Sequence, residues 1–331
     1  MNYFEKYSKK PFIIAEIGSN FDQDFNKLKE LIVQSKKAGA NAVKLQVFES
    51  SRLYPNKKSK TYKIFKSMEF DKSWYVKTQK FCKKKNIILF ASSFDKYSTK
   101  FLIDQKTNII KFASSEANKI SDIIFAAKFN QPIIFSTGMS EFRDIVDVVD
   151  IFKRLKNENL CLMHCSALYP PKLNELNLLS IAKLKKIFNV PIGFSDHTTG
   201  SLAACIAASL GATIFEKHIT LDRSSNGPDH FYATEPHEFK KYVNDIKKTF
   251  KMMGEASFEV PHRVKTQTRR SSLFWKKNLR EKTIIQKSHI IDKKNSFLGV
   301  PTFYQKHLVG QTLQQNVKSN SPINFSQFKI K

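Results

Sequence analysis

The segments VPIGFSD (190–196) and TIFEKHI (213–219) decide the fold, because they frame one complete strand–helix–strand unit. Each segment is a short apolar run with the length and composition of a buried strand. Between them lies an Ala-rich stretch, 200–210, followed by Gly211, a residue type that commonly ends a helix. Two buried strands joined by a helix are typical of a parallel sheet that is covered on both faces.

The same pattern recurs through the first two thirds of the chain. The helical stretch 25–38 places Leu28, Leu31 and Ile32 on one face and meets Gly39 as its stop. Eight units of this kind predict an α/β fold, a closed (β/α)8 barrel of the TIM type. The eight apolar runs are FIIAEIG (12–18), AVKLQVF (42–48), IILFASS (87–93), NIIKFAS (108–114), PIIFSTG (132–138), LCLMHCS (160–166), VPIGFSD and TIFEKHI.

Polar residues occur at the C-terminal end of every predicted strand, which is where barrel enzymes keep their chemistry. In chain order they are Glu16; Lys44 and Gln46; Ser92 and Ser93; Lys111, Ser114 and Glu116; Ser136 and Thr137; His164 and Tyr169; Ser195 and His197; and His218. Alternate residues of a barrel strand point inward, so certain pairs share one face: Lys44 with Gln46, Ser195 with His197, and Glu216 with His218.

Two of these residues, Lys44 and Lys111, would enter the barrel among several hydroxyls. Ammonium and hydroxyl donors match the oxygens of phosphate and carboxylate, so the pattern predicts a site for a small, multiply charged anion. The alternative is that the two lysines form structural ion pairs with Glu16 or Glu116.

The histidines of GFSDHT (193–198) and FEKHIT (215–220) each close an apolar run, and GPDH (227–230) follows. A single histidine in such a place is more often a hydrogen-bonded core residue than a metal ligand. Two imidazoles at the ends of adjacent strands favour an open metal site instead, and neutral imidazole suits manganese, iron, zinc or cobalt. The spacing does not choose among these metals.

The composition is strongly basic, with 56 Lys and Arg against 29 Asp and Glu and a formal net charge of +27. Only eight of the basic residues are Arg, and the lysines are spread along helix-like stretches, which is typical of solvated faces. Dedicated nucleic-acid proteins favour Arg forks and aromatic platforms, so nucleic acid is not an expected partner. A positive field would still attract an anionic substrate.

The remaining compositional features point to an intracellular protein. The four cysteines form no CxxC pair and lie in apolar segments, which indicates reduced thiols. The N-terminus lacks a cleavable signal, and no apolar run approaches the roughly 20 residues of a membrane span. We therefore expect a cytoplasmic location and no membrane partner.

The alternation of strands and helices ends near residue 250. We expect a catalytic barrel over 1–252, a linker over 253–268 and a small C-terminal domain over 269–331. That domain has strand-like pieces at SLFW, TIIQ and SHII and a Gly-Val-Pro turn at 299–301, but it is too small to hold a large core.

Over residues 11–315 the chain resembles the sialic acid (nonulosonate) synthase family. The resemblance is specific because the motifs occur as an ordered set: IAEIGSN, VKLQ, KFASSE, STGMS, HCSALYP, GFSDHT, EKHITLD, GPDH and RRSSLFWKKNL. It implies a barrel followed by a small antifreeze-like (SAF) domain. It also implies condensation of phosphoenolpyruvate with an N-acetylated amino sugar, such as N-acetylmannosamine or a diacetamido-trideoxy hexose.

The resemblance also assigns roles to residues. The phosphate and carboxylate of phosphoenolpyruvate would be held by Lys44, Ser92, Lys111, Ser114, Ser136 and Ser195. A divalent ion, Mn²⁺ or else Mg²⁺ or Co²⁺, would be bound by His197 and His218. The sugar would contact Glu16, Gln46 and Asp229, with Tyr169 also in the substrate site. The expected catalytic residues are Glu116, Lys111 and Glu16, with Glu116 moving a proton or positioning water.

Family members are dimers in which the small domain of one subunit caps the partner's barrel. Here the usual Arg-Pro-Gly turn of that domain is replaced by KKNSFLGVP, and Lys294 would stand in for the Arg without its bidentate fork. The chain also has Phe21 in place of His, Ser93 in place of Pro, Ala167 and Leu168 in place of polar residues, and FYAT (231–234) in place of KASL.

Two other functions stay open at this point. One is a 3-deoxy-acid synthase that uses a phosphorylated aldose, although the histidine pair and the small C-terminal domain count against it. The other is a catalytically retired basic binding protein. A retired site has no physical need for both the cationic and the metal-ligand residues.

Overall fold

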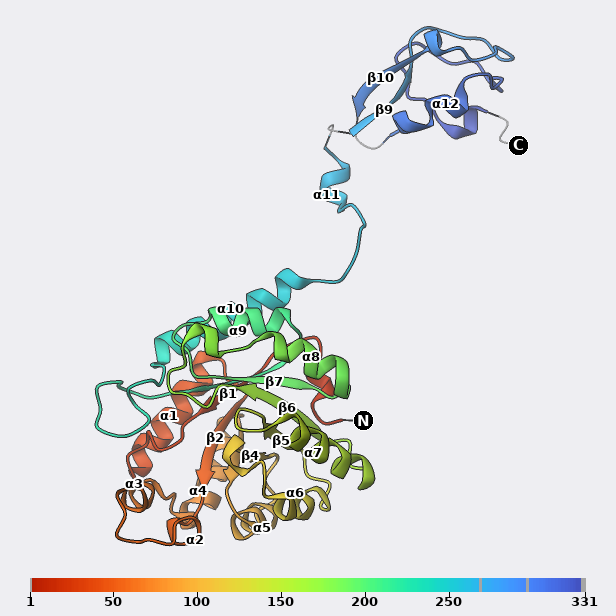
Figure 1. Ribbon diagram of the computed structural model, residues 1–331. Helices are drawn as coiled ribbons and strands as arrows, with labels where there is room; N and C mark the ends of the chain where they lie inside the picture. Colours follow the sequence, from red (N-terminus) through yellow and green to blue (C-terminus); the bar gives the residue numbers. More distant parts are fainter. Residues whose placement is uncertain (1, 268–269, 296–297, 329–331) are drawn as a thin grey trace. The chain divides into compact units, whose positions relative to one another are not determined.

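The structure is a computed structural model that describes residues 2–267, 270–295 and 298–328. The chain divides into two compact units, 1–254 and 255–331 (Figure 1).

The first unit is a closed barrel of eight parallel strands in sequence order. It closes because β1 pairs in parallel with both β2 and β8. Each predicted apolar run contains one strand, which confirms the (β/α)8 fold. The strands are β1 (Phe12–Glu16), β2 (Ala42–Val47), β3 (Ile88–Ser93), β4 (Ile110–Phe112), β5 (Ile133–Ser136), β6 (Leu160–Cys165), β7 (Ile192–Asp196) and β8 (Ile214–His218).

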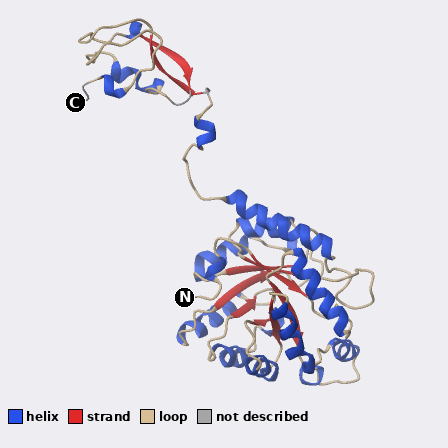
Figure 2. Cartoon of the chain, turned by 180° about the vertical axis from the view of Figure 1, so that it is seen from behind, coloured by secondary structure: helices blue, strands red, loops and turns tan. Residues whose placement is uncertain are grey.

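Helices surround the strands on the outside of the barrel (Figure 2). They are α1 (Phe25–Ala38), α2 (Ser50–Leu53), α3 (Lys60–Met68), α4 (Tyr75–Lys84), α5 (Lys96–Asp104), α6 (Ile120–Ala127), α7 (Phe142–Arg154), α8 (Leu179–Phe188), α9 (Leu202–Ser209) and α10 (Pro236–Met253). Helix α1 has the predicted bounds. Asp24 caps its N-terminus by accepting from the backbone N–H groups of Asn26 and Lys27, and Gly39 ends it with a left-handed φ of 99°.

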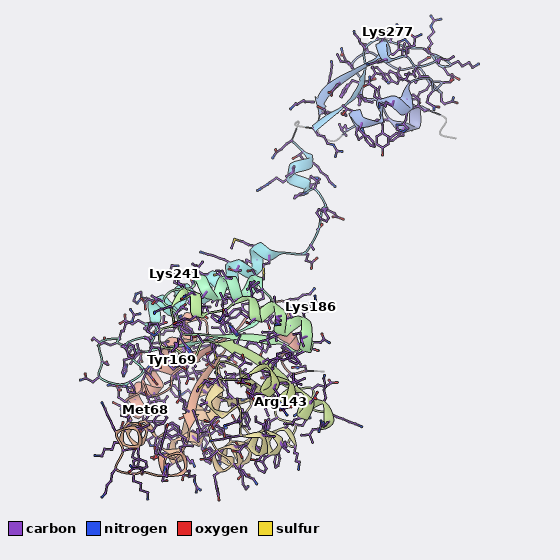
Figure 3. All side chains as sticks on the ribbon, in the orientation of Figure 1. Met68, Arg143, Tyr169, Lys186, Lys241 and Lys277 are labelled. Carbon is purple, nitrogen blue, oxygen red and sulfur yellow. The ribbon has the colours of Figure 1, made fainter. Side chains whose placement is uncertain are left out.

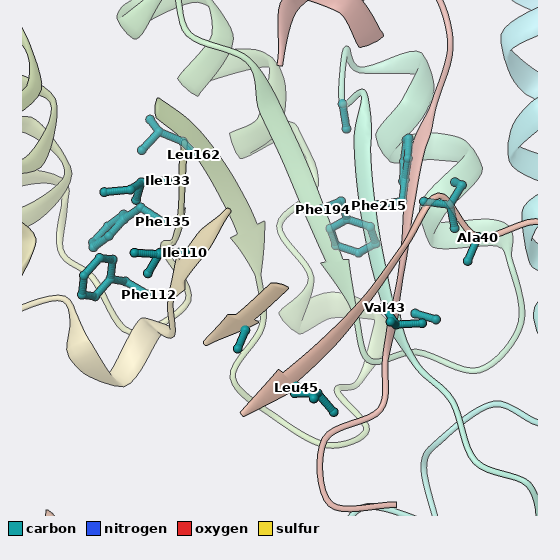
Figure 4. Close-up of a cluster of buried hydrophobic side chains, with 14 of the residues drawn as sticks. Ala40, Val43, Leu45, Ile110, Phe112, Ile133, Phe135, Leu162, Phe194 and Phe215 are labelled. Atoms are coloured by element: carbon teal, nitrogen blue, oxygen red, sulfur yellow. The ribbon is translucent and has the colours of Figure 1, made fainter. Parts of the chain in front are cut away.

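The barrel strands alternate between two apolar layers. Outward residues pack against the helices, and Figure 4 shows part of this layer, including Phe112, Phe135 and Phe215. Inward residues at the N-terminal end, such as Phe12 and Phe90, form a second cluster closed from below by the N-terminal segment, including Phe4 and Tyr7. Because apolar residues fill this lower half of the barrel, the polar inward residues are confined to the C-terminal half.

The second unit contains α11 (His262–Lys265), α12 (Gln305–Leu308) and an antiparallel pair, β9 (Arg270–Trp275) and β10 (Ile290–Asn295). Its small core is built around Trp275. SLFW and the end of SHII lie in strands as predicted. The prediction for TIIQ (283–286) was wrong, since this segment lies outside β9 and β10 and forms an isolated bridge from Ile284 to Thr312. The predicted boundary at 268/269 lies outside the described residues, and the antifreeze-like fold stays a prediction.

Within the described residues, no helix combines the length and apolar character needed to cross a membrane. The four cysteines are free thiols, as the sequence predicts.

Candidate active site

Glu216 of β8 is the centre of a buried polar cluster inside the barrel. Its Oε1 lies 2.5 Å from Nζ of Lys111 and accepts a 3.0 Å hydrogen bond from Oγ of Ser195. Its Oε2 lies 3.4 Å from Nζ of Lys44. These residues come from β2, β4, β7 and β8, so barrel closure brings together side chains that are far apart in the sequence.

A second carboxylate, Glu16 of β1, adjoins this cluster. Its Oε2 lies 3.2 Å from Lys44 Nζ, and its Oε1 accepts a 2.8 Å hydrogen bond from Gln46. Lys44 also donates to Oγ of Ser92 at 2.9 Å. The ion-pair alternative is thus partly confirmed: Lys44 does pair with Glu16, whereas Lys111 pairs with Glu216 rather than Glu116.

Burial and charge set the ionisation of this cluster. Burial raises the pKa of Glu16 to about 7, a shift that Lys44 opposes and Glu216 supports. Burial also acts to raise the pKa of Glu216, but Lys111 and Lys44 outweigh it and hold that pKa below its usual range. Glu216 is therefore an ionised counter-charge for the lysines, while Glu16 can gain or lose a proton near neutral pH.

The two predicted metal ligands lie side by side above this cluster. The ring centroids of His197 and His218 are 5.7 Å apart, and each residue is 7% exposed. His197 Nδ1 lies 2.8 Å from the carbonyl oxygen of Ser166, and its Nε2 lies 3.3 Å from Oγ of Ser195. Burial lowers the pKa of His197 to about 3 and that of His218 to about 4. Both rings are therefore neutral near pH 7, which is the form that binds metals.

The donor set fits a metal ion held by two imidazoles. The contact between His197 Nδ1 and Ser166 orients that ring in the way carbonyl groups orient metal-bound histidines. His218 Nδ1 is buried and has no hydrogen-bond partner among the described residues. Within the same residues no group of three or more His, Cys, Asp or Glu side chains could hold a metal. An ion here would therefore complete its coordination with substrate or water.

A cavity of about 400 Å³ opens beside this histidine pair at the C-terminal end of the strands. Tyr169 and Met68, two of its lining residues, are labelled in Figure 3. The Tyr169 ring centroid lies 4.1 Å from that of His197 and 5.0 Å from that of Tyr232. The other residues that line the cavity include Gln46, Ser114, Ser115, Phe65, Phe94, Met139, His218, Asp229 and Phe231.

Asp229 is fixed at the edge of the cavity by three donors. Its Oδ2 accepts from the backbone N–H of Ser19 at 3.2 Å and from the Ser19 hydroxyl at 2.8 Å, and its Oδ1 accepts from the Tyr232 hydroxyl at 2.8 Å. Gly18 makes this approach possible, because a Cβ there would lie 2.8 Å from Asp229 Oδ2 and its φ of +53° favours glycine.

Glu116, Ser136 and Lys294 were also predicted as site residues. Glu116 pairs with Lys119 at 2.5 Å and accepts from Ser115, and among the described residues those lining the cavity do not include it. Ser136 is buried inside the barrel end, 2% exposed. Lys294 is exposed on β10 of the second unit.

Two residues of the site, Glu216 and Tyr232, were not among the site residues predicted from the sequence. Glu216 had a signal in the sequence, because it stands two residues before His218 and must share its face. Tyr232 lay in the FYAT segment, and only the fold reveals its contacts with Asp229 and Tyr169.

Comparisons with known proteins agree with this architecture. Residues 31–258 match the NeuB family. A pseudaminic acid synthase of Campylobacter jejuni is 30% identical over 97% of this chain and 97% of its own. An N,N'-diacetyllegionaminic acid synthase of the same species is 31% identical over 95% of this chain and 99% of its own.

A solved structure gives the same result. The crystal structure of the N-acetylneuraminic acid synthetase of Leptospira borgpetersenii superposes with a TM-score of 0.73 and 33% identity, over 76% of this chain and 88% of that one. The chain therefore belongs to the NeuB family and is an enzyme of the synthase kind represented by these relatives.

Proposed function

We propose that this enzyme condenses phosphoenolpyruvate with the aldehyde of an N-acetylated amino sugar, forming a nine-carbon acid sugar and releasing phosphate. The acceptor would be N-acetylmannosamine or a diacetamido-trideoxy hexose. The observation that carries the proposal is the placement of Lys44 and Lys111 around Glu216, directly beside His197 and His218. A two-lysine anion site next to a two-imidazole metal site suits one charged substrate and one carbonyl substrate.

The lysines would bind the phosphate and carboxylate of phosphoenolpyruvate, assisted by Ser92, Ser114, Ser136 and Ser195. Lys44 and Lys111 are held in place by Glu216 and Glu16, so little ordering of these long side chains is needed when the anion arrives. The added negative charge would raise the pKa of Glu16 further above its present value of about 7. Glu16 would then carry a proton when the substrate is bound.

The acceptor sugar would occupy the cavity, with Gln46, Asp229 and Tyr169 against it. A divalent ion, most naturally Mn²⁺ with Mg²⁺ or Co²⁺ as alternatives, would be held by His197 and His218 and would supply Lewis-acid polarisation of the aldehyde. Glu16, in register with His218 on the neighbouring strand, would give its proton to the aldehyde oxygen as that oxygen gains charge.

The bond changes follow from these positions. C3 of phosphoenolpyruvate attacks the aldehyde carbon, a C–C bond forms and the enol double bond is lost, which leaves cationic character at C2. Water adds to C2, and phosphate departs with cleavage of the C–O bond to give the keto acid. Lys44 and Lys111 hold the departing phosphate, whose charge they oppose throughout. Glu116, which is paired with Lys119, would position this water or move its proton.

Assembly is a separate proposal. A homodimer, with the C-terminal unit of one subunit capping the barrel of the other and Lys294 reaching its sugar site, follows from the family resemblance. A molar mass measured by light scattering tests the dimer directly.

The experiment that tests the function is mass spectrometry of the reaction with Mn²⁺, phosphoenolpyruvate and a panel of acceptors. The panel contains N-acetylmannosamine, 2,4-diacetamido-2,4,6-trideoxy hexoses and arabinose 5-phosphate. The proposal predicts a product carrying the three carbons of pyruvate, with equimolar phosphate, for at least one N-acetylated sugar. Turnover with arabinose 5-phosphate alone, or none with any N-acetylated sugar, would overturn it.

A further inference from the structure

A buried ion pair that has no part in the proposed chemistry lies on the outer side of the two strands that carry the histidines. Lys217 Nζ lies 3.1 Å from Oδ2 of Asp196, and the two residues are 2% and 1% exposed. They occupy the layer between the barrel and its helices, where the Lys217 ammonium lies 5.0 Å from the ring centroid of Tyr242 on α10.

Along β7 and β8 this pair lies between the Ser195–Glu216 pair and the two histidines, His197 and His218. Ser195 is the register partner of Glu216, and Asp196 is the register partner of Lys217. The Ser195–Glu216 rung points inward and is closed by a hydrogen bond. The Asp196–Lys217 rung points outward and is closed by the ion pair. The next residues along the two strands are His197 and His218, which point inward again.

The same pair also holds the backbone that follows His197. Asp196 Oδ1 accepts from the backbone N–H of Thr198 at 2.9 Å and from its hydroxyl at 2.7 Å. Lys217 Nζ donates to the carbonyl oxygen of Thr198 at 2.6 Å. The residues on both sides of His197 are therefore fixed to each other and to β8.

Stability alone gives no reason for these charges. Removing two ions from water is costly, and well-packed apolar residues in place of a buried ion pair are often as stabilising or more so. The pair instead makes four polar contacts between the two strands and the loop after β7. Because hydrogen bonds depend on direction, these contacts fix the orientation of the groups that they join.

We propose that Asp196, Lys217 and Thr198, here called the outer clamp, are positioning residues that set the separation of His197 and His218 for binding one divalent ion. This inference rests on the proposed metal role of the two histidines. It assigns the clamp no contact with substrate or metal. Loss of contacts that orient metal ligands typically weakens metal affinity about 10- to 100-fold.

The test is the affinity of the full chain for Mn²⁺, measured without substrates by the electron paramagnetic resonance signal of the free ion. The variant Asp196→Asn/Lys217→Met removes both charges together, so that neither is left unpaired. It should bind Mn²⁺ at least tenfold more weakly than the parent. The visible spectrum of bound Co²⁺, which reports ligand geometry, should change as well.

A matched control separates positioning from general loss of stability. Asn157 is buried and donates to the carbonyl oxygen of Ala127 at 2.9 Å, remote in the sequence from both histidines. Asn157→Ala should lower the melting temperature but leave the Mn²⁺ affinity within twofold of the parent. If the double variant fails to fold, Thr198→Val serves instead, since it removes a single hydrogen bond and should weaken binding about threefold to tenfold.

The outcomes are distinct. A folded double variant, or a folded Thr198→Val, with the parental Mn²⁺ affinity and an unchanged Co²⁺ spectrum would overturn the clamp and leave the proposed function standing. A parent chain that binds none of Mn²⁺, Co²⁺ and Zn²⁺ would overturn the metal role itself and the clamp with it.

Discussion

Lys111 and Glu216 are 105 residues apart in the sequence, yet their side chains meet inside the barrel with Nζ 2.5 Å from Oε1. The contact joins β4 to β8 across the interior and puts a fixed cation beneath the histidine pair. Because Glu216 also contacts Lys44 and Ser195, one carboxylate organises most of the proposed anion site.

Lys111→Ala should remove one of the two cations that oppose the charge of the departing phosphate. Loss of one preorganised electrostatic contact costs about 3 kcal/mol, so kcat/KM for phosphoenolpyruvate should fall roughly 100-fold. Steady-state phosphate release measures it. Lys100 is exposed and pairs with Asp104 on its own helix α5, so Lys100→Ala is the control, with the parental rate expected. An unaffected Lys111→Ala enzyme would remove Lys111 from the mechanism.

Glu216→Gln should destabilise the protein and make its stability depend on bound phosphoenolpyruvate. The change removes one carboxylate partner of Lys44, which keeps Glu16, and the carboxylate partner of Lys111. Breaking a buried pair in this way costs about 3–5 kcal/mol. Phosphoenolpyruvate would supply the missing negative charge. Melting curves with and without it should therefore show a larger stabilisation of the variant than of the parent. Equal shifts would mean that the ligand does not contact these lysines.

His197→Gln should flatten the pH dependence of stability in the metal-free protein. The pKa of His197 is about 3 when folded, against about 6.5 when unfolded. Below about pH 6.5 the unfolded chain binds a proton that the folded chain does not, so the parent loses stability as the pH falls toward 3.

Gln does not titrate, so this loss disappears in the variant, while the opposing contribution of Glu16 is present in both proteins. Urea unfolding in the presence of a chelator at several pH values measures the difference. Parallel curves for parent and variant would show that His197 is not buried in its neutral form.

Tyr232→Phe should weaken binding of the acceptor sugar without affecting phosphoenolpyruvate. The phenol donates a 2.8 Å hydrogen bond to Asp229, which is proposed to contact the sugar. Loss of such a bond is worth about 1 kcal/mol, so KM for the sugar should rise about fivefold. Tyr75→Phe removes a comparable buried bond, to Thr107, and should leave both KM values at the parental level. A change confined to KM for phosphoenolpyruvate would contradict this placement of the sugar.

The fold could be predicted from the sequence because each barrel strand is covered on both sides and is therefore a nearly continuous apolar run. The end of α1 at Gly39 could also be predicted, because the residue that ends a helix often has a left-handed φ, here 99°, which glycine adopts readily. The inward direction of Lys44, Gln46, Ser195 and His197 followed from alternation along a strand. TIIQ was mistaken for a strand because four residues carry too little periodicity to distinguish a strand from an isolated bridge.

The contacts between strands were harder to predict. Lys111 pairs with Glu216 and not with Glu116, which is nearer in the sequence. This pairing depends on closure of the barrel, because the interior of a closed barrel brings opposite strands together. The pairing of Asp196 with Lys217 depends on the register of β7 with β8, which neither strand specifies alone. The ring of Tyr232 against Tyr169 joins two loops whose paths have no periodic signal.

The central claim is that the carbon–oxygen bond of phosphoenolpyruvate breaks only as it condenses with a sugar aldehyde. The most direct measurement uses phosphoenolpyruvate labelled with ¹⁸O at the oxygen bridging carbon and phosphorus, with Mn²⁺ and the accepted N-acetylated sugar. Our account predicts that all of the label appears in inorganic phosphate, and that no phosphate forms without the sugar. Label retained in the organic product, or phosphate released without an acceptor, would contradict it.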